Sequence, residues 1–161
     1  MRVLLVTSHY KPGPGGAETV VFLTERLLRE AGHDVVPFAV AEPDTSPTPW
    51  LRWFPPPAGA GARTEPGRRL AGIYSRSARR ALESLLTQVR PDVAHVHHVH
   101  EFLTLSVLEA LRDHEVPTVM TMHDYAVFSR IQVSHETSTS LRPQGTLAGQ
   151  RAGRRSPRSP S

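Results

Sequence analysis

Residues 1–38, MRVLLVTSHYKPGPGGAETVVFLTERLLREAGHDVVPF, decide the fold of this chain. Arg2 to Val6 is a short, continuous apolar run, typical of a parallel strand buried on both faces. A loop rich in glycine and proline follows from Ser8 to Gly16, and a helical pattern runs from Ala17 to Ala31. Val35 to Val40 is a second apolar run. The order strand, loop, helix, strand predicts a βαβ unit.

The helix of this unit carries apolar residues at a spacing close to 3.6. Glu18 lies in its first turn, and Gly32 stands where a C-terminal cap is expected. The spacing predicts one apolar stripe facing the sheet, made of Val20, Leu23, Leu27 and Ala31.

A long proline-rich connection follows from Ala41 to Gly67. Its aromatic residues, Trp50, Trp53 and Phe54, favour a loop that packs on the rest of the domain. Arg68 to Arg90 then predicts a single helix that Pro91 stops. The apolar side of this helix is formed by Leu70, Ile73, Ala78, Ala81, Leu82, Leu85 and Val89.

The alternation of strand and helix continues beyond Pro91. Asp92 to His97 is the third strand candidate, and the next helix, about Phe102 to Arg112, is expected to bury Leu105, Leu108 and Leu111. Pro117 to Met122 forms a fourth strand that ends at His123. The chain is therefore predicted to be α/β, with a Rossmann-like parallel sheet and helices on both faces. We place the domain boundary at 130 and expect the Arg/Ser/Pro-rich tail, 131–161, to be disordered.

Composition and charge exclude several classes of protein. Five of the 19 Lys and Arg and one of the 15 Asp and Glu follow residue 130, so residues 1–130 carry equal numbers of both signs. The net charge of +4 therefore lies in the tail, which argues against a nucleic-acid partner. Without cysteine, neither a disulfide framework nor a thiolate zinc site can form. We see no signal peptide and no transmembrane segment, and expect a soluble, cytoplasmic protein.

Ligands of parallel sheets bind at the carboxyl ends of the strands, where this sequence places three candidate groups. The first is the glycine loop with Gly15 and Gly16, whose backbone amides at a helix N-terminus favour phosphate. It is neither a Walker loop nor the dinucleotide fingerprint, so a tight turn without a ligand remains the alternative. The other two groups are His95 to His100 and His123 to Tyr125.

The histidines allow two interpretations. His95 and His97 point to the same face of a strand, and with His123 or Asp124 as a third ligand they could hold a divalent metal. Alternatively, a histidine at a strand end donates to a substrate hydroxyl or phosphate, or carries a proton. We favour the second interpretation for His97 and His123, and expect His95 to be a buried core imidazole.

Two blocks of the sequence resemble family 4 glycosyltransferases. Residues 1–38 look like the start of that family, with its Gly-Gly-Ala-Glu loop and Ala-Gly-His helix end. PDVAHVHHVHEFLTLSVLEALRDHEVPTVMTMHDY, residues 91–125, is similar to its second signature, which ends in Thr-x-His-Asp-Tyr. The resemblance implies the N-terminal half of a GT-B architecture, in which two Rossmann-like domains face each other across a cleft. The N-terminal domain receives the acceptor and the C-terminal domain binds the nucleotide-sugar.

The resemblance also assigns roles to individual residues. His97 and His123 would be the catalytic histidines, with His97 contacting the transferred sugar or the acceptor. Gly15 and Gly16 would face phosphate. The remaining substrate-binding residues would be Glu18, His98, His100, Asp124 and Tyr125. The family typically transfers with retention and without a bound metal, so we expect no cofactor apart from a nucleotide-sugar co-substrate.

The chain departs from the family after Phe128, and nothing in it resembles the donor-binding domain with its paired glutamates. It looks like a truncated or frame-shifted product, and we expect it to be inactive alone. Its partners would be a sugar or lipid-linked acceptor and a separately encoded donor-binding domain, with peripheral membrane contact as a further possibility. The alternative is a non-catalytic binding module or a relic.

Overall fold

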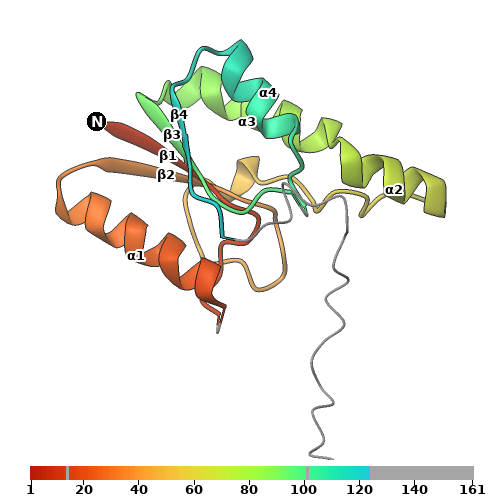
Figure 1. Cartoon of the computed structure of the whole chain (residues 1–161), viewed down its shortest axis with the longest axis horizontal. Coiled ribbons are helices and arrows are strands. Elements are labelled where there is room, and N and C mark those ends of the chain that lie inside the picture. Colours follow the sequence, from red (N-terminus) through yellow and green to blue (C-terminus); the bar gives the residue numbers. More distant parts are fainter. Residues whose placement is uncertain (14, 101, 124–161) are drawn as a thin grey trace, which may run out of the picture. The chain divides into compact units, whose positions relative to one another are not determined.

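The computed structural model describes residues 1–13, 15–100 and 102–123. Four parallel strands form one sheet in the order β2-β1-β3-β4 (Figure 1). Their bounds are β1 Arg2–Val6, β2 Asp34–Phe38, β3 Val93–Val96 and β4 Thr118–Met120. The four expected strands are all present, and the α/β parallel fold is confirmed. Asp124, Tyr125 and the tail 131–161 lie outside the described residues.

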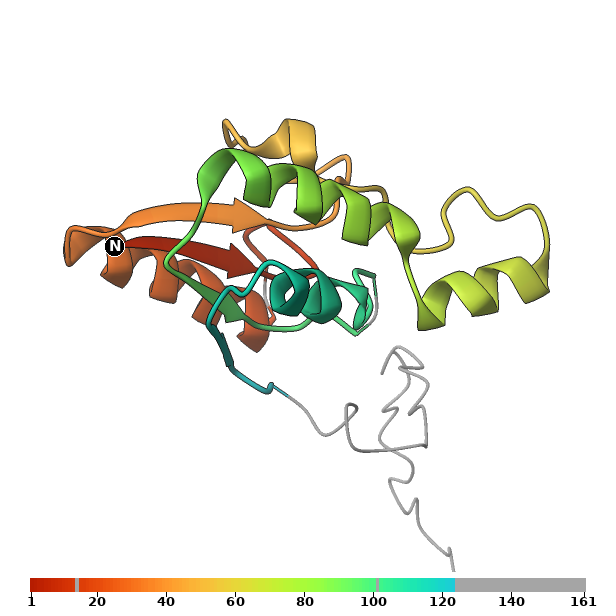
Figure 2. The same cartoon turned by 90° about the horizontal axis from the view of Figure 1, so that it is seen from above.

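Helices cover both faces of the sheet (Figures 1 and 2). Helix α1, Gly16–Glu30, packs its Val21 and Leu28 against Leu5 and Val35. The opposite face carries the larger core, in which side chains such as Leu4 meet helices α3 and α4. The helical segments are α1, η1 Leu51–Trp53, α2 Glu65–Ile73, α3 Arg76–Val89 and α4 Ser106–Asp113.

Helix α1 turns a different side to the sheet from the one expected. Val20, Leu23 and Leu27 are exposed, whereas Val21 and Glu25 are buried. The Glu25 carboxylate tolerates burial because the hydroxyl of Tyr10 donates to it at 2.9 Å and Arg29 donates to it at 2.8 Å. A charged residue thus occupies the middle of the buried stripe. The end of α1 is as expected, since Gly32 adopts φ +80 and its N–H donates to the carbonyl of Arg29.

The helix expected over residues 68–90 is two helices, α2 and α3. The break lies at Ser75, whose hydroxyl accepts from the Ala78 N–H and caps α3. The backbone N–H of Ser75 donates to the hydroxyl of Thr104 at 3.0 Å, which fixes the break against the β3–α4 connection. As a result α2 lies outside the core. Its Leu70 and Ile73, expected to be buried, are 68% and 72% exposed.

The proline-rich connection packs on the domain, as its aromatic residues indicated. Phe54 is buried in the larger core, and Trp50 and Trp53 lie half-buried against it. The N–H of Ala41 donates to the carbonyl of Pro55 at 2.8 Å, which ties the start of the segment to its middle. This segment therefore covers the core beside β2 and α3.

Strand β4 lies at one margin of the sheet. It pairs with β3 along one side, and no strand of the described residues pairs with its other side. Thr118 and Val119 are exposed, Val119 by 57%. In the part of the chain that the structure describes, no helix is both long and apolar enough to cross a membrane.

Candidate functional site

The carboxyl ends of three neighbouring strands bring the predicted site residues to one edge of the sheet. The strand ends are joined by backbone hydrogen bonds from His97 N–H to the carbonyl of Val6 and from Thr121 N–H to the carbonyl of Val96, each 2.8 Å long. The Ser8 N–H donates to the carbonyl of His98 at 2.6 Å. Backbone hydrogen bonds therefore hold the starts of the connections after β1, β3 and β4 next to one another.

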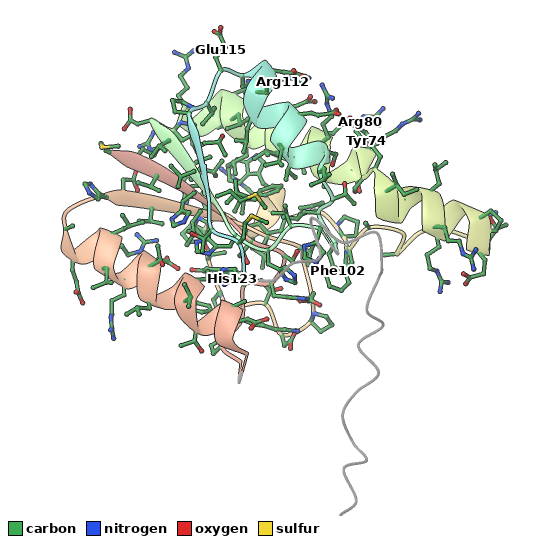
Figure 3. All side chains as sticks on the ribbon, in the orientation of Figure 1. Tyr74, Arg80, Phe102, Arg112, Glu115 and His123 are labelled. Atoms are coloured by element: carbon green, nitrogen blue, oxygen red, sulfur yellow. The ribbon has the colours of Figure 1, made fainter. Side chains whose placement is uncertain are left out.

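His97 and His123, predicted as the two catalytic histidines, are in direct contact. The Nδ1 atom of His97 lies 2.9 Å from the Nε2 atom of His123, and the two rings stack with centroids 5.2 Å apart. His97 follows β3 directly, and His123 lies just beyond β4 (Figure 3). One ring of this pair must donate and the other accept, since a neutral imidazole has one N–H and one lone pair.

The two histidines differ in their exposure. His97 is buried, with 1% of its surface exposed, whereas His123 is half-buried. Burial, followed by the charges of His95 and His123, lowers the pKa of His97 to about 4. His97 is therefore uncharged at neutral pH. Such a side chain is poorly placed to touch a sugar, and His123 is the member of the pair that a ligand can reach.

His95 is half-buried and lies beside His97. Its ring packs on His97 with centroids 4.2 Å apart, and its Nε2 lies 2.8 Å from the hydroxyl of Thr121. Burial and the nearby His123 lower the pKa of His95 as well. The expected side-by-side placement of His95 and His97 on one strand face is thus realised, with the two ring planes tilted by 34°. Within residues 1–123 as described, no set of three or more His, Cys, Asp and Glu is arranged to hold a metal ion.

His98 and His100 form a second pair, in the connection from β3 to α4. Their Nε2 atoms are 3.1 Å apart, and their rings meet edge to face with centroids 4.2 Å apart. The sequence placed both among the substrate-binding residues, and they lie in the segment that directly follows His97.

The glycine loop meets α1 at Gly15, which caps the helix, and Gly16 is the first helical residue. A Cβ built on Gly15 would lie 1.9 Å from a carboxylate oxygen of Glu18. The Glu18 side chain therefore folds back over the first turn and places a negative charge where the amides favour an anion. A Cβ on Gly16 would meet nothing within 4 Å. A phosphate at this loop would have to displace or avoid Glu18.

A depression of about 450 Å³ lies beside this loop. Its lining includes Gly13, Glu18 and Phe22, and none of the described histidines contributes to it. The histidine pair and the glycine loop are therefore two separate features of the same domain.

A polar cluster that sequence reasoning missed joins the ends of β1 and β2. The Nδ1 atom of His9 lies 2.7 Å from a carboxylate oxygen of Glu42, and Lys11 bridges Glu42 and Asp44. The ring of His9 packs edge-on against Phe102 with centroids 4.9 Å apart. The strand-end rule could have found this cluster, because His9 and Glu42 follow two adjacent parallel strands.

Comparison with known protein families gives a match over most of the chain. Residues 14–155 match the family model described as Glycosyltransferase Family 4. No curated protein matches the chain. The matched range contains the last three residues of the glycine loop, Gly15 and Gly16 among them, and both members of the His97–His123 pair.

Proposed function

Because the chain belongs to glycosyltransferase family 4, we propose that it provides the acceptor-side domain of an enzyme that transfers a sugar from a nucleotide-sugar to a hydroxyl group. The observation that carries this proposal is the contact between His97 and His123 at the carboxyl edge of the sheet. This contact puts the half-buried imidazole of His123 beside the uncharged imidazole of His97. That combination suits hydrogen bonding to the hydroxyls and phosphate oxygens of sugars.

The substrate contacts follow from the position of each residue. His123 would contact the transferred sugar or the acceptor, and His98 and His100 would extend this contact along the β3–α4 connection. Gly15 and Gly16 would face a phosphate group, with Glu18 moving aside. The anomeric configuration would be retained, and the nucleotide-sugar would be a co-substrate with no further cofactor.

A second domain completes the site in this proposal. Glycosyl transfer needs donor and acceptor held in one geometry, and positioning accounts for a large share of the rate. The described residues form one sheet, and His97 and His123 lie at its carboxyl edge. A donor-binding domain, encoded separately or in the same gene, would face this edge, so the chain alone would be inactive.

The exposed side chains of helix α2 favour a lipid-linked acceptor in this proposal. Leu70 and Ile73 are largely exposed, and Arg68 and Arg69 lie beside them in the same short helix. No residue of α2 is buried. A short helix with apolar and basic side chains in water suits the surface of an anionic membrane, where a lipid-linked acceptor would be found.

The test is transfer in the presence and absence of a donor-binding domain. The chain is mixed with labelled UDP- and GDP-sugars and candidate acceptors, alone and with a separately produced donor-binding domain of a family 4 enzyme. We expect labelled product only in the mixture, a loss of at least tenfold with His123→Ala, and no loss with His114→Ala, a control at an exposed histidine. The anomeric proton coupling of the product reports the configuration.

Two results would contradict the proposal. Transfer by the chain alone would show that no second domain is needed. Full transfer by the His123→Ala variant in the mixture would show that His123 takes no part in the reaction. Absence of product in every mixture, together with binding of an acceptor to the chain, would favour a non-catalytic binding module.

A further inference from the structure

His97 is too deeply buried to meet a substrate, yet it is hydrogen-bonded to the one histidine of the pair that can. The exposed surface of His97 is 1%, and its Nδ1 is 2.9 Å from Nε2 of His123. Its ring also packs on that of His95, with centroids 4.2 Å apart. The chemistry of this contact depends on which of the two rings gives the proton.

The second ring nitrogen of His97 decides the direction of this hydrogen bond. Its Nε2 is buried, and no hydrogen-bond partner for it is found among the residues that the structure describes. If Nε2 carried the proton, the ring would bury an unpaired N–H. If Nδ1 carries the proton, only a lone pair is buried without a partner. Unpaired buried donors are the rarer case in folded proteins, so the proton belongs on Nδ1.

This choice fixes the state of His123 as well. A His97 ring that donates from Nδ1 requires a lone pair on Nε2 of His123. A neutral His123 ring must then carry its own proton on Nδ1, the nitrogen that does not face His97.

We infer that His97 is a positioning residue, which holds His123 as the Nδ1-protonated tautomer and so gives the ligand edge of the sheet an N–H donor. The inference rests on the proposed function for its purpose. The donor would bind an oxygen atom of the substrate, either a sugar hydroxyl or a phosphate oxygen. His97 itself touches neither reactant, which changes its role from the catalytic one expected from the sequence.

His95 is needed for a different purpose. Its Nε2 is directed to Thr121 at 2.8 Å, so it makes no hydrogen bond with either ring of the pair. It packs on His97 and restricts the plane of that ring. Removing its nitrogens should leave the tautomer of His123 unchanged, and this makes His95 the matched control.

The experiment reads the tautomers directly. The full chain is produced with ¹⁵N-labelled histidine and examined by long-range ¹H–¹⁵N correlation at a pH about two units above the ordinary imidazole pKa of about 6.5. We expect His97 and His123 each to show a protonated Nδ1 and an unprotonated Nε2. In His97→Phe, which keeps a ring in the stack, His123 should populate both tautomers. In His95→Phe it should keep the Nδ1–H form.

Two outcomes overturn the inference. A protonated Nε2 on His123 in the unaltered chain does so without any variant, so the test survives a variant that fails to fold. A single Nδ1–H tautomer of His123 in folded His97→Phe would show that His97 does not set it. The measurement needs no substrate, so its failure leaves the transfer proposal standing, and a failed transfer assay leaves the tautomer result standing.

Discussion

The hydroxyl of Tyr10 lies 2.9 Å from a carboxylate oxygen of Glu25, and this hydrogen bond ties the loop after β1 to the middle of α1. Both side chains are buried. Burial, and then the bond to Glu25, raise the pKa of Tyr10 above its ordinary value. The glycine loop is thus fixed at its beginning, ahead of Gly15, which caps the helix.

Replacing Tyr10 by Phe should destabilise the domain by about 1–3 kcal/mol, because a buried carboxylate loses one of its donors. Arg29 still donates to Glu25 and limits the loss. Urea denaturation measures the change. Tyr74→Phe is the control, since Arg79 also donates to the carboxylate that Tyr74 contacts, and its effect should be smaller. Equal losses of unfolding free energy in the two variants would show that burial does not strengthen the Tyr10–Glu25 hydrogen bond.

Replacing Gly15 by Ala should move the Glu18 side chain rather than unfold the chain. The added Cβ would lie 1.9 Å from the end of a flexible side chain, which can rotate away. We expect a loss of about 0.5–1 kcal/mol, since alanine is also a poor N-cap. In a Glu18→Ala background the loss should shrink. Gly16→Ala, where a Cβ meets nothing, should be neutral or slightly stabilising. Equal losses at both glycines would contradict this view.

Acid should weaken the fold in the range set by His97. Its pKa is about 4 in the folded chain, below the ordinary 6.5, so the unfolded chain binds more protons between these values. Stability is therefore full above about 6.5 and falls as the pH drops towards 4, by about 1–3 kcal/mol. Denaturation at several pH values measures the slope, and His97→Phe should reduce it, leaving the contribution of His95, whose pKa is also lowered. The lowered carboxyl pKa values of Asp44 and Asp113 act only below 3.8. An unchanged slope in His97→Phe would assign the effect to other groups.

Replacing Leu70 and Ile73 by Ser should reduce binding to anionic vesicles by at least fivefold without lowering stability, because both side chains are exposed. Co-sedimentation with phosphatidylserine-containing and phosphatidylcholine vesicles gives the comparison. Leu27→Ser removes an exposed leucine from α1 and is the matched control. Equal binding of all variants, or none by the unaltered chain, would separate α2 from any membrane role.

The strands, their parallel direction and the Gly32 cap could be predicted because each depends on a local pattern. The buried side of α1 could not, because two stripes lie next to each other on that helix. The true one contains Glu25, whose burial depends on Tyr10 and Arg29. Likewise, the helix break at Ser75 depends on a hydrogen bond to Thr104, which is 29 residues away in the chain.

The candidate site was likewise predictable only in part. The strand-end rule predicted that His97 and His123 would lie at one edge, and the structure brings them into contact. It did not predict which of them is buried, because that depends on packing against the larger core. His9 and Glu42 were missed for lack of a motif, although the same rule places them together.

Among the described residues no strand pairs with the outer side of β4, and this has a practical consequence for work with the domain. The run from Thr118 to Met122 contains no charge and no proline, two of the features by which natural proteins keep a strand margin from pairing with another chain. We therefore expect purified protein to self-associate as its concentration rises. Introducing a lysine at the exposed Val119 should keep the protein monomeric in sedimentation experiments, and would give a better-behaved sample for crystallisation or NMR.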